Sequence, residues 1–246
     1  MKKILERTIF VAQLIVKGLI PPLYSFERLE TFCKQKISKN PTAHLPRLFL
    51  AHLYKDYRKY AEARKEFETL VQQGYKDKSI LKALGEICYK LHAYAEAIRY
   101  CEPVTLRYSK DKFFNCNLGM SYVYTQAYEK ALPYLIRAEE LSLKWGPLYE
   151  AGGFCFFQLG AFERSAEWYR KALSFDPSSP SEVRNNAARA YVQLANALIK
   201  EGKRQEAIAQ FHLALEVEPE DSIVHAILRT LNQLGEDSSF PGQHLG

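Results

Sequence analysis

The sequence repeats a small residue with a fixed period of 34 positions. An aromatic residue lies three positions before each of these small residues. The small residues are Ala63, Ala97, Ala131 and Ser165, and the aromatic residues are Tyr60, Tyr94, Tyr128 and Phe162. Self-similarity at a fixed period of roughly 20–50 residues is typical of chains built from stacked structural units. The chain is therefore expected to fold as a series of similar modules.

A second set of small residues lies upstream in the same register. Gly85, Gly119 and Gly153 are spaced by 34 residues, and Ala51 fills this position in the first copy. Small side chains at both sets of positions let two helices approach closely, and large residues such as Tyr122 fill the space beside them. One helical hairpin cannot bury its apolar face alone, so neighbouring hairpins must stack. The predicted fold class is all-α, an α-solenoid of helix-turn-helix repeats.

The period divides the chain into repeats. In the fifth copy the marker Ala207 lies 42 residues after Ser165, so eight residues are inserted. The inserted segment has helical composition, and it predicts two extra turns on the first helix of that repeat. The predicted repeats are 44–77, 78–111, 112–145, 146–179 and 180–221, followed by a capping helix at 222–234 and a disordered tail at 235–246.

The strongest individual motifs are L-G-x-x-Y at 118–122, A-x-x-x-F at 63–67 and at 207–211, and the closing prolines Pro177 and Pro219. With these motifs, residues 44–221 resemble the tetratricopeptide repeat family, whose pattern is W-x₂-L-G-x₂-Y…A-x₃-F…P. The tryptophan of that pattern is replaced here by Arg47, Leu81, Asn115, Tyr149 and Tyr191. The resemblance implies a right-handed solenoid whose first helices line a concave, peptide-binding groove.

Residues 1–43 are interpreted as an N-terminal amphipathic helix followed by the rest of a degenerate repeat. The uncharged run from Thr8 to Val16 is too short to cross a membrane. At 100° per residue, Glu6 and Lys17 lie on one stripe and the apolar residues lie opposite. This helix either packs as the first helix of that repeat, with Ser25 capping the second helix, or lies on an anionic membrane surface.

Charge and cysteine usage narrow the class of protein. Residues 1–112 carry 22 Lys and Arg against 12 Asp and Glu, which favours acidic partners, anionic lipid or nucleic acid for this half. The charges are interspersed with acids, however, as on an ordinary solvated surface. The five cysteines include no C-x-x-C pair and no zinc spacing. They are expected to be reduced and packed in the core.

The sequence contains no motif that would support catalysis or cofactor binding. Phosphate-binding loops, dinucleotide-binding glycines, H-E-x-x-H and G-x-S-x-G are all absent. We therefore expect no enzymatic activity, no metal and no cofactor. Nucleic acid is not expected either, because RNA-binding repeats need base-reading polar residues at fixed sites, and these copies vary freely.

The expected binding surface is the side of the first helices that faces away from the second helix. This side is largely apolar in the two middle repeats and polar or basic in the flanking ones. The predicted groove residues are Phe113, Met120, Tyr124, Phe154, Phe157, Tyr89, Lys82, Lys90, Arg189 and Asn196. An apolar floor with basic shoulders suits an amphipathic helix or an extended peptide. Alternatively, the curvature of the solenoid or the tail covers these residues.

The predicted function is that of a non-catalytic, cytoplasmic adaptor or scaffold that binds a protein or peptide partner. The alternative is a membrane-peripheral assembly factor anchored through residues 1–20.

Overall fold

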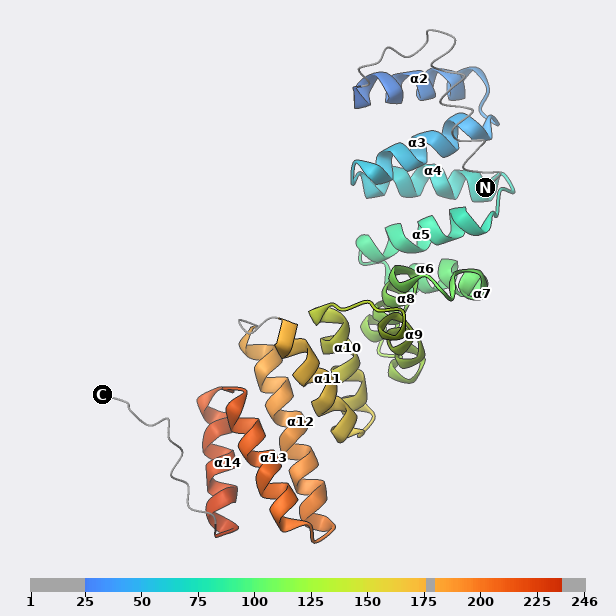
Figure 1. Cartoon of the computed structure of the whole chain (residues 1–246). Coiled ribbons are helices and arrows are strands. Elements are labelled where there is room, and N and C mark those ends of the chain that lie inside the picture. Colours follow the sequence, from blue (N-terminus) through green and yellow to red (C-terminus); the bar gives the residue numbers. More distant parts are fainter. Residues whose placement is uncertain (1–24, 176–179, 236–246) are drawn as a thin grey trace. The chain divides into compact units, whose positions relative to one another are not determined.

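The computed structural model describes residues 25–175 and 180–235. All regular structure in these ranges is helical (Figure 1), and the predicted all-α helical-repeat fold is confirmed. The chain divides into two compact units, residues 1–109 and residues 110–246, and each is described by itself. The predicted helix within residues 1–24 and the tail from residue 236 onward lie outside the described residues. No helix in the described ranges is long and apolar enough to cross a membrane.

The first unit consists of consecutive antiparallel helices. Each packs against the next one along the chain, from α2 to α6. Its helices are α2 (Phe26–Lys39), α3 (His44–Asp56), α4 (Tyr60–Gln72), α5 (Lys78–Lys90), α6 (Tyr94–Cys101) and α7 (Thr105–Tyr108), with the 3₁₀ turn η1 (Glu102–Val104) between the last two. The side chain of Ser25 accepts a hydrogen bond from the Arg28 amide and caps α2, as predicted.

The second unit continues the same helical pattern. Its helices are α8 (Lys112–Tyr124), α9 (Tyr128–Glu140), α10 (Gly146–Gln158), α11 (Phe162–Phe175), α12 (Ser181–Lys200), α13 (Arg204–Glu216) and α14 (Asp221–Gln233). The helix that carries the eight-residue insertion, α12, has 20 residues, whereas α8 and α10 have 13 each. Besides packing within the hairpins, α10 contacts α8 and α12, and α12 contacts α14. The first helices therefore form a row within this unit.

In two hairpins of the second unit, a small residue of the first helix faces a large side chain of the second. A Cβ added to Gly119 would lie 2.7 Å from Leu135 Cδ2, and one added to Gly152 would overlap the Trp168 ring. These partners lie three or four residues after the marker residues Ala131 and Ser165. The small residue thus accommodates the next turn of the second helix, while the marker itself is fully buried beside it.

The turn inside each hairpin adopts the same left-handed backbone conformation. One residue with positive φ occurs in each hairpin from 44 to 216, at Arg58, His92, Gln126, Gly160 and Gly202. The steps between them are the 34 and 42 residues of the sequence period. The following amide bonds back across the helix end, as from Lys59 N to Tyr54 O at 2.8 Å and from Ala161 N to Phe156 O at 2.9 Å.

Two prolines lie within second helices, with different results. At Pro103 the α-helix stops, because the ring removes an amide donor and clashes with the preceding turn. The chain passes through η1 before α7 resumes. Pro133 lies inside α9, which stays continuous from Tyr128 to Glu140. Pro103 therefore interrupts the second helix of its hairpin with a 3₁₀ turn, whereas Pro133 does not interrupt α9.

The five cysteines are free and buried, as the sequence predicted. Burial raises the pKa of Cys33, Cys101 and Cys155 to about 12 and that of Cys88 to about 11. Thiols with such pKa values stay protonated near neutral pH, so they behave as small apolar core residues.

Candidate functional site

The ten predicted groove residues belong to four first helices. Lys82, Tyr89 and Lys90 lie on α5 in the first unit. The other seven lie on α8, α10 and α12 in the second unit. The predicted set is therefore divided between the two units.

On α5, the predicted residues combine positive charge with aromatic rings. Lys82 Nζ lies 4.9 Å from the ring centroid of Tyr108, and Lys90 Nζ lies 5.7 Å from that of Tyr89. Both distances are within the range of cation–π attraction. Glu86 lies between the two lysines at helical spacing and pairs with Lys55 at 2.6 Å. The pair with Lys55 neutralises the charge of Glu86, so Lys82 and Lys90 leave the α5 face with a net positive charge.

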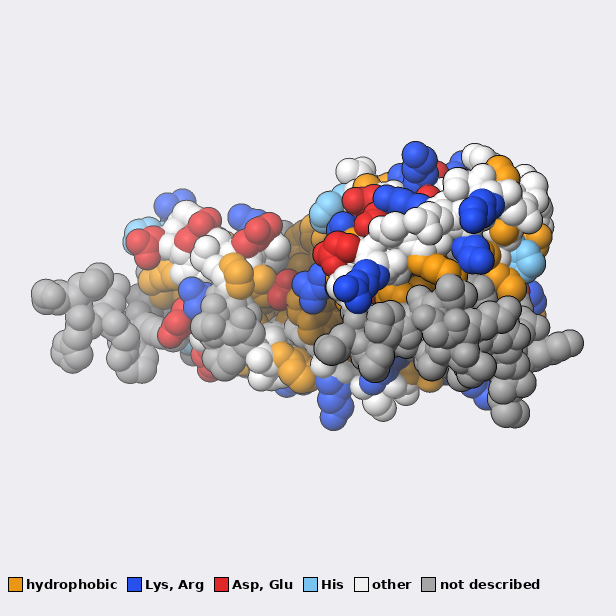
Figure 2. All heavy atoms as spheres, turned by 90° about the horizontal axis from the view of Figure 1, so that it is seen from above, with side chains coloured by type: hydrophobic (Ala, Val, Ile, Leu, Met, Phe, Trp, Pro, Cys, Tyr) orange, Lys and Arg blue, Asp and Glu red, His pale blue; other side chains and the backbone are white. Residues whose placement is uncertain are grey.

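Basic and acidic side chains are mixed on one face of the molecule (Figure 2). On the face drawn in Figure 2, Lys and Arg side chains are interspersed with Asp and Glu, and no extended block of one sign is seen. Such a mixed surface is typical of a solvated protein exterior.

On α8, two of the three predicted residues are accessible. Phe113 is 61% exposed and Tyr124 is 54% exposed, whereas Met120 is only 7% exposed. The three positions follow one helical stripe, so the burial of Met120 separates the two exposed rings. Asp111 fixes the start of this helix, because its carboxylate accepts bonds from the amides of Phe113 and Phe114, each at 3.1 Å.

On α10, the predicted phenylalanines are half-buried. Phe154 lies edge-on to Tyr128 with ring centroids 5.6 Å apart, and Phe157 meets Phe162 at the same distance. Both also pack against the core cluster that includes Tyr169 and Tyr191. Neighbouring helices thus partly cover the apolar stripe, and the accessible apolar surface on this row is concentrated at Phe113 and Tyr124.

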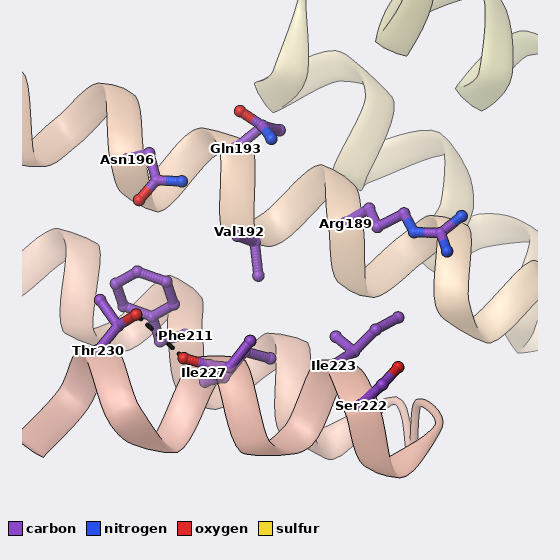
Figure 3. Close-up of a pocket in the computed structure, with 10 residues that line it drawn as sticks. Arg189, Val192, Gln193, Asn196, Phe211, Ser222, Ile223, Ile227 and Thr230 are labelled. Carbon is purple, nitrogen blue, oxygen red and sulfur yellow. Dashed lines mark hydrogen bonds between the residues drawn. The ribbon is translucent and has the colours of Figure 1, made fainter.

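A pocket of about 250 Å³ lies between α12, α13 and α14. Two predicted residues, Arg189 and Asn196, belong to its lining. Figure 3 shows Val192 of α12 and Ile223 of α14 pointing into the space between the two helices, with Arg189 at the same end as Ile223. The full lining is Arg189, Val192, Gln193, Asn196, Phe211, Ser222, Ile223, Ala226, Ile227 and Thr230.

The α14 wall was not predicted from the sequence, although the period contains a signal for it. Adding 34 to Arg189, Gln193 and Asn196 gives positions 223, 227 and 230. The residues there are Ile223, Ile227 and Thr230, and all three line the pocket. The helix predicted as a cap at 222–234 therefore occupies the position of a further first helix beside α12.

A buried amide holds the two walls together. Asn185 is nearly fully buried on α12. Its Nδ2 donates to Glu220 Oε2 at 3.1 Å, and its Oδ1 accepts from the Glu220 amide at 2.9 Å. Ser222 Oγ also donates to the Glu220 carboxylate, at 3.0 Å. These bonds fix the N-terminus of α14 against α12 and define the width of the pocket.

Two buried tyrosines have raised pKa values. Burial is the main cause that raises the pKa of Tyr54 to about 12 and also raises that of Tyr169. Both rings belong to the core. Among the described residues, no group of three or more His, Cys, Asp or Glu could hold a metal ion.

The chain also matches models of known protein families. One model described as "Tetratricopeptide repeat" matches residues 50–102 and 116–180, and a second with the same description matches residues 188–221. Together they cover more than half of the chain. No curated protein sequence matches it.

Several solved structures share the fold at low sequence identity. YrrB, a TPR protein with an unusual peptide-binding site, is 19% identical with a TM-score of 0.58, and the match covers 79% of this chain and 96% of YrrB. MamA (MSR-1) is 20% identical with a TM-score of 0.55, covering 71% and 96%. MamA from Desulfovibrio magneticus RS-1 is 16% identical with a TM-score of 0.51, covering 70% and 93%. The chain belongs to the tetratricopeptide repeat family.

Proposed function

We propose that this chain is a non-catalytic adaptor whose first helices bind a peptide or an amphipathic helix of a protein partner. Membership of the tetratricopeptide repeat family supports a role as a protein-interaction scaffold. The observation that carries the finer proposal is the pocket between α12 and α14. It has apolar walls, it contains the predicted residues Arg189 and Asn196, and it is lined by α12, one of the first helices.

The exposed rings of α8 supply a second element of the same surface. Large aromatic side chains that solvent reaches are typical interface anchors, because they bury much area at a small cost in conformational entropy. Phe113 and Tyr124 meet this description better than Met120, Phe154 and Phe157, which are at least half-covered. YrrB, a TPR protein of similar fold, has an unusual peptide-binding site, which is consistent with the proposal.

The test is selection of binding peptides from a random twelve-residue phage library on the immobilised full-length chain. We expect specific peptides to be enriched. The double variant Phe113→Ala/Tyr124→Ala should weaken their binding by at least about thirtyfold, because one interface aromatic often contributes about 2 kcal/mol and about 1.4 kcal/mol corresponds to a factor of ten. Circular dichroism and the melting temperature should stay unchanged, because both rings are exposed.

Leu213→Ala provides the matched control, since Leu213 is an exposed apolar residue on the second helix α13. This variant should bind the selected peptides like the unmodified chain. Failure to enrich any peptide, or equal losses in both variants, would contradict the proposal. The proposed cytoplasmic location and the membrane-peripheral alternative depend on residues 1–20 and are tested separately by deletion of that segment.

A further inference from the structure

The pocket between α12 and α14 has a size that fits a single side chain. Its volume of about 250 Å³ lies below the roughly 300–1,000 Å³ typical of pockets that enclose whole small molecules. The floor and walls are apolar, formed by Val192, Phe211, Ile223 and Ile227. An aliphatic or aromatic side chain of a longer ligand would therefore replace water against apolar surface, and the rest of that ligand would remain outside.

The polar groups at the rim have hydrogen-bonding capacity to spare. The side chains of Gln193 and Asn196 form no hydrogen bond to another described residue, and the Arg189 guanidinium forms only a long one, from Nη1 to Asn186 Oδ1 at 3.4 Å. Thr230, in contrast, donates to the Ala226 carbonyl at 3.0 Å. A carboxamide offers both a donor and an acceptor, which match a peptide unit. A guanidinium offers several donors, which match a carboxylate.

Charge distinguishes between possible ligands. Arg189 is the one charged residue in the lining. Two acids lie nearby, at the start of α14. Glu220 already accepts bonds from Asn185 and Ser222, while Asp221 is exposed at the first turn. Among the described residues, neither acid forms an ion pair with Arg189, so the guanidinium keeps donors for a carboxylate of the ligand.

We infer that this pocket binds an extended peptide segment through one large apolar side chain with an Asp or Glu close to it in sequence. The apolar side chain enters between Val192 and Ile223, the carboxylate pairs with Arg189, and Asn196 bonds the peptide backbone. This inference rests on the proposed function and specifies the ligand chemistry of one part of the surface.

The experiment compares two selections from the same random twelve-residue phage library, one on the full-length chain and one on its Arg189→Glu variant. Peptides from the unmodified chain should be enriched in Asp or Glu within three positions of a Leu, Ile, Met or Phe. The Arg189→Glu selection should lose this enrichment and favour Lys or Arg at the same position. Equal acidic content in both selections would overturn the inference.

A blocking variant tests the pocket directly. Ala226 lines the pocket and is exposed on α14, so Ala226→Phe should fill the space without disturbing the core. Binding of the selected acidic peptides should fall at least tenfold. Ala209→Phe is the matched control, because Ala209 is an exposed alanine on α13 that does not line the pocket. Both variants should keep the helical circular dichroism of the unmodified chain.

The outcomes separate the two proposals. In one outcome, the binding of the selected peptides is weakened by Phe113→Ala/Tyr124→Ala but not by Ala226→Phe. This result would support the adaptor function and overturn the pocket inference. A library that yields no binding peptide would overturn both. Acidic peptides lost with Ala226→Phe but retained with Ala209→Phe would support both.

Discussion

At the scale of single residues, close packing inside each hairpin depends on where a Cβ is missing. Gly152 and Gly146 both belong to α10, but their surroundings differ. A Cβ at Gly152 would overlap the buried Trp168 ring, whereas the nearest atom to a Cβ at Gly146 would lie 3.9 Å away. The same substitution should therefore have opposite consequences at two positions of one helix.

We predict that Gly152→Ala lowers the free energy of unfolding by about 1–3 kcal/mol, the usual range for overpacking. Gly146→Ala should be neutral or slightly stabilising, because alanine favours the helix and meets no clash. Urea denaturation followed by circular dichroism measures both. Equal stability of the two variants would mean that the Trp168 ring does not pack against α10 as described.

The sequence predicted the packing role of single residues where their contacts lie within one hairpin. The periodicity identified Ala131, Ser165 and Gly119 as packing positions because a helix face repeats every few residues. It did not identify Leu135 as the side chain closest to Gly119. It also did not indicate that Met120 is covered while Phe113 is exposed. Whether a neighbouring hairpin covers a side chain depends on how the hairpins stack. The residues along one face of a single helix do not predict that stacking.

At the scale of elements, the position of a proline within a helix decides its effect. Pro133 lies in the second turn of α9, where a residue with an amide would donate to the carbonyl four positions earlier. Pro147 lies in the first turn of α10, where amide groups have no intrahelical acceptor in any case.

We predict that Pro133→Ala raises the free energy of unfolding by about 1–3 kcal/mol, since it restores one backbone hydrogen bond in a continuous helix. Pro147→Ala should change stability by less than about 0.5 kcal/mol, because no bond is gained. Thermal melts at matched protein concentration distinguish the two. A stabilised Pro147→Ala together with an unchanged Pro133→Ala would contradict this account of α9.

Elements were predictable from the sequence to different degrees. The first helices α3, α5, α8 and α10 begin at His44, Lys78, Lys112 and Gly146, the residues at which the predicted repeats begin. The position of the break at Glu102–Val104 follows from one proline. The role of α14 as a pocket wall was not predicted, because its residues do not carry the leucine–glycine pair that marks the first helices α5 and α8. The assignment of repeats as domains remains a prediction.

At the scale of the whole molecule, the open question concerns residues 1–20, which lie outside the described residues. We predict that deleting them lowers the melting temperature, because the predicted first helix of a degenerate repeat would no longer cover its neighbours. Binding to vesicles that contain anionic lipid should be equally weak with and without the segment. A deletion that leaves the melting temperature unchanged but abolishes vesicle binding would instead favour the membrane-peripheral alternative.

The left-handed turns have a consequence for how this protein can change over evolutionary time. A residue with a side chain loses about 1–2 kcal/mol in the left-handed conformation. Arg58, His92 and Gln126 nevertheless adopt this conformation, which Gly160 and Gly202 adopt without that cost. The fold therefore tolerates mutational drift at these turns, because the hydrogen bonds of the hairpin hold the backbone conformation whichever residue is present. Glycine at the three positions would recover part of the cost, less its own entropic penalty of roughly 0.5–1 kcal/mol. A change from glycine to a residue with a side chain at one of these turns would therefore lower thermal stability and add a new surface group, and each turn can change separately.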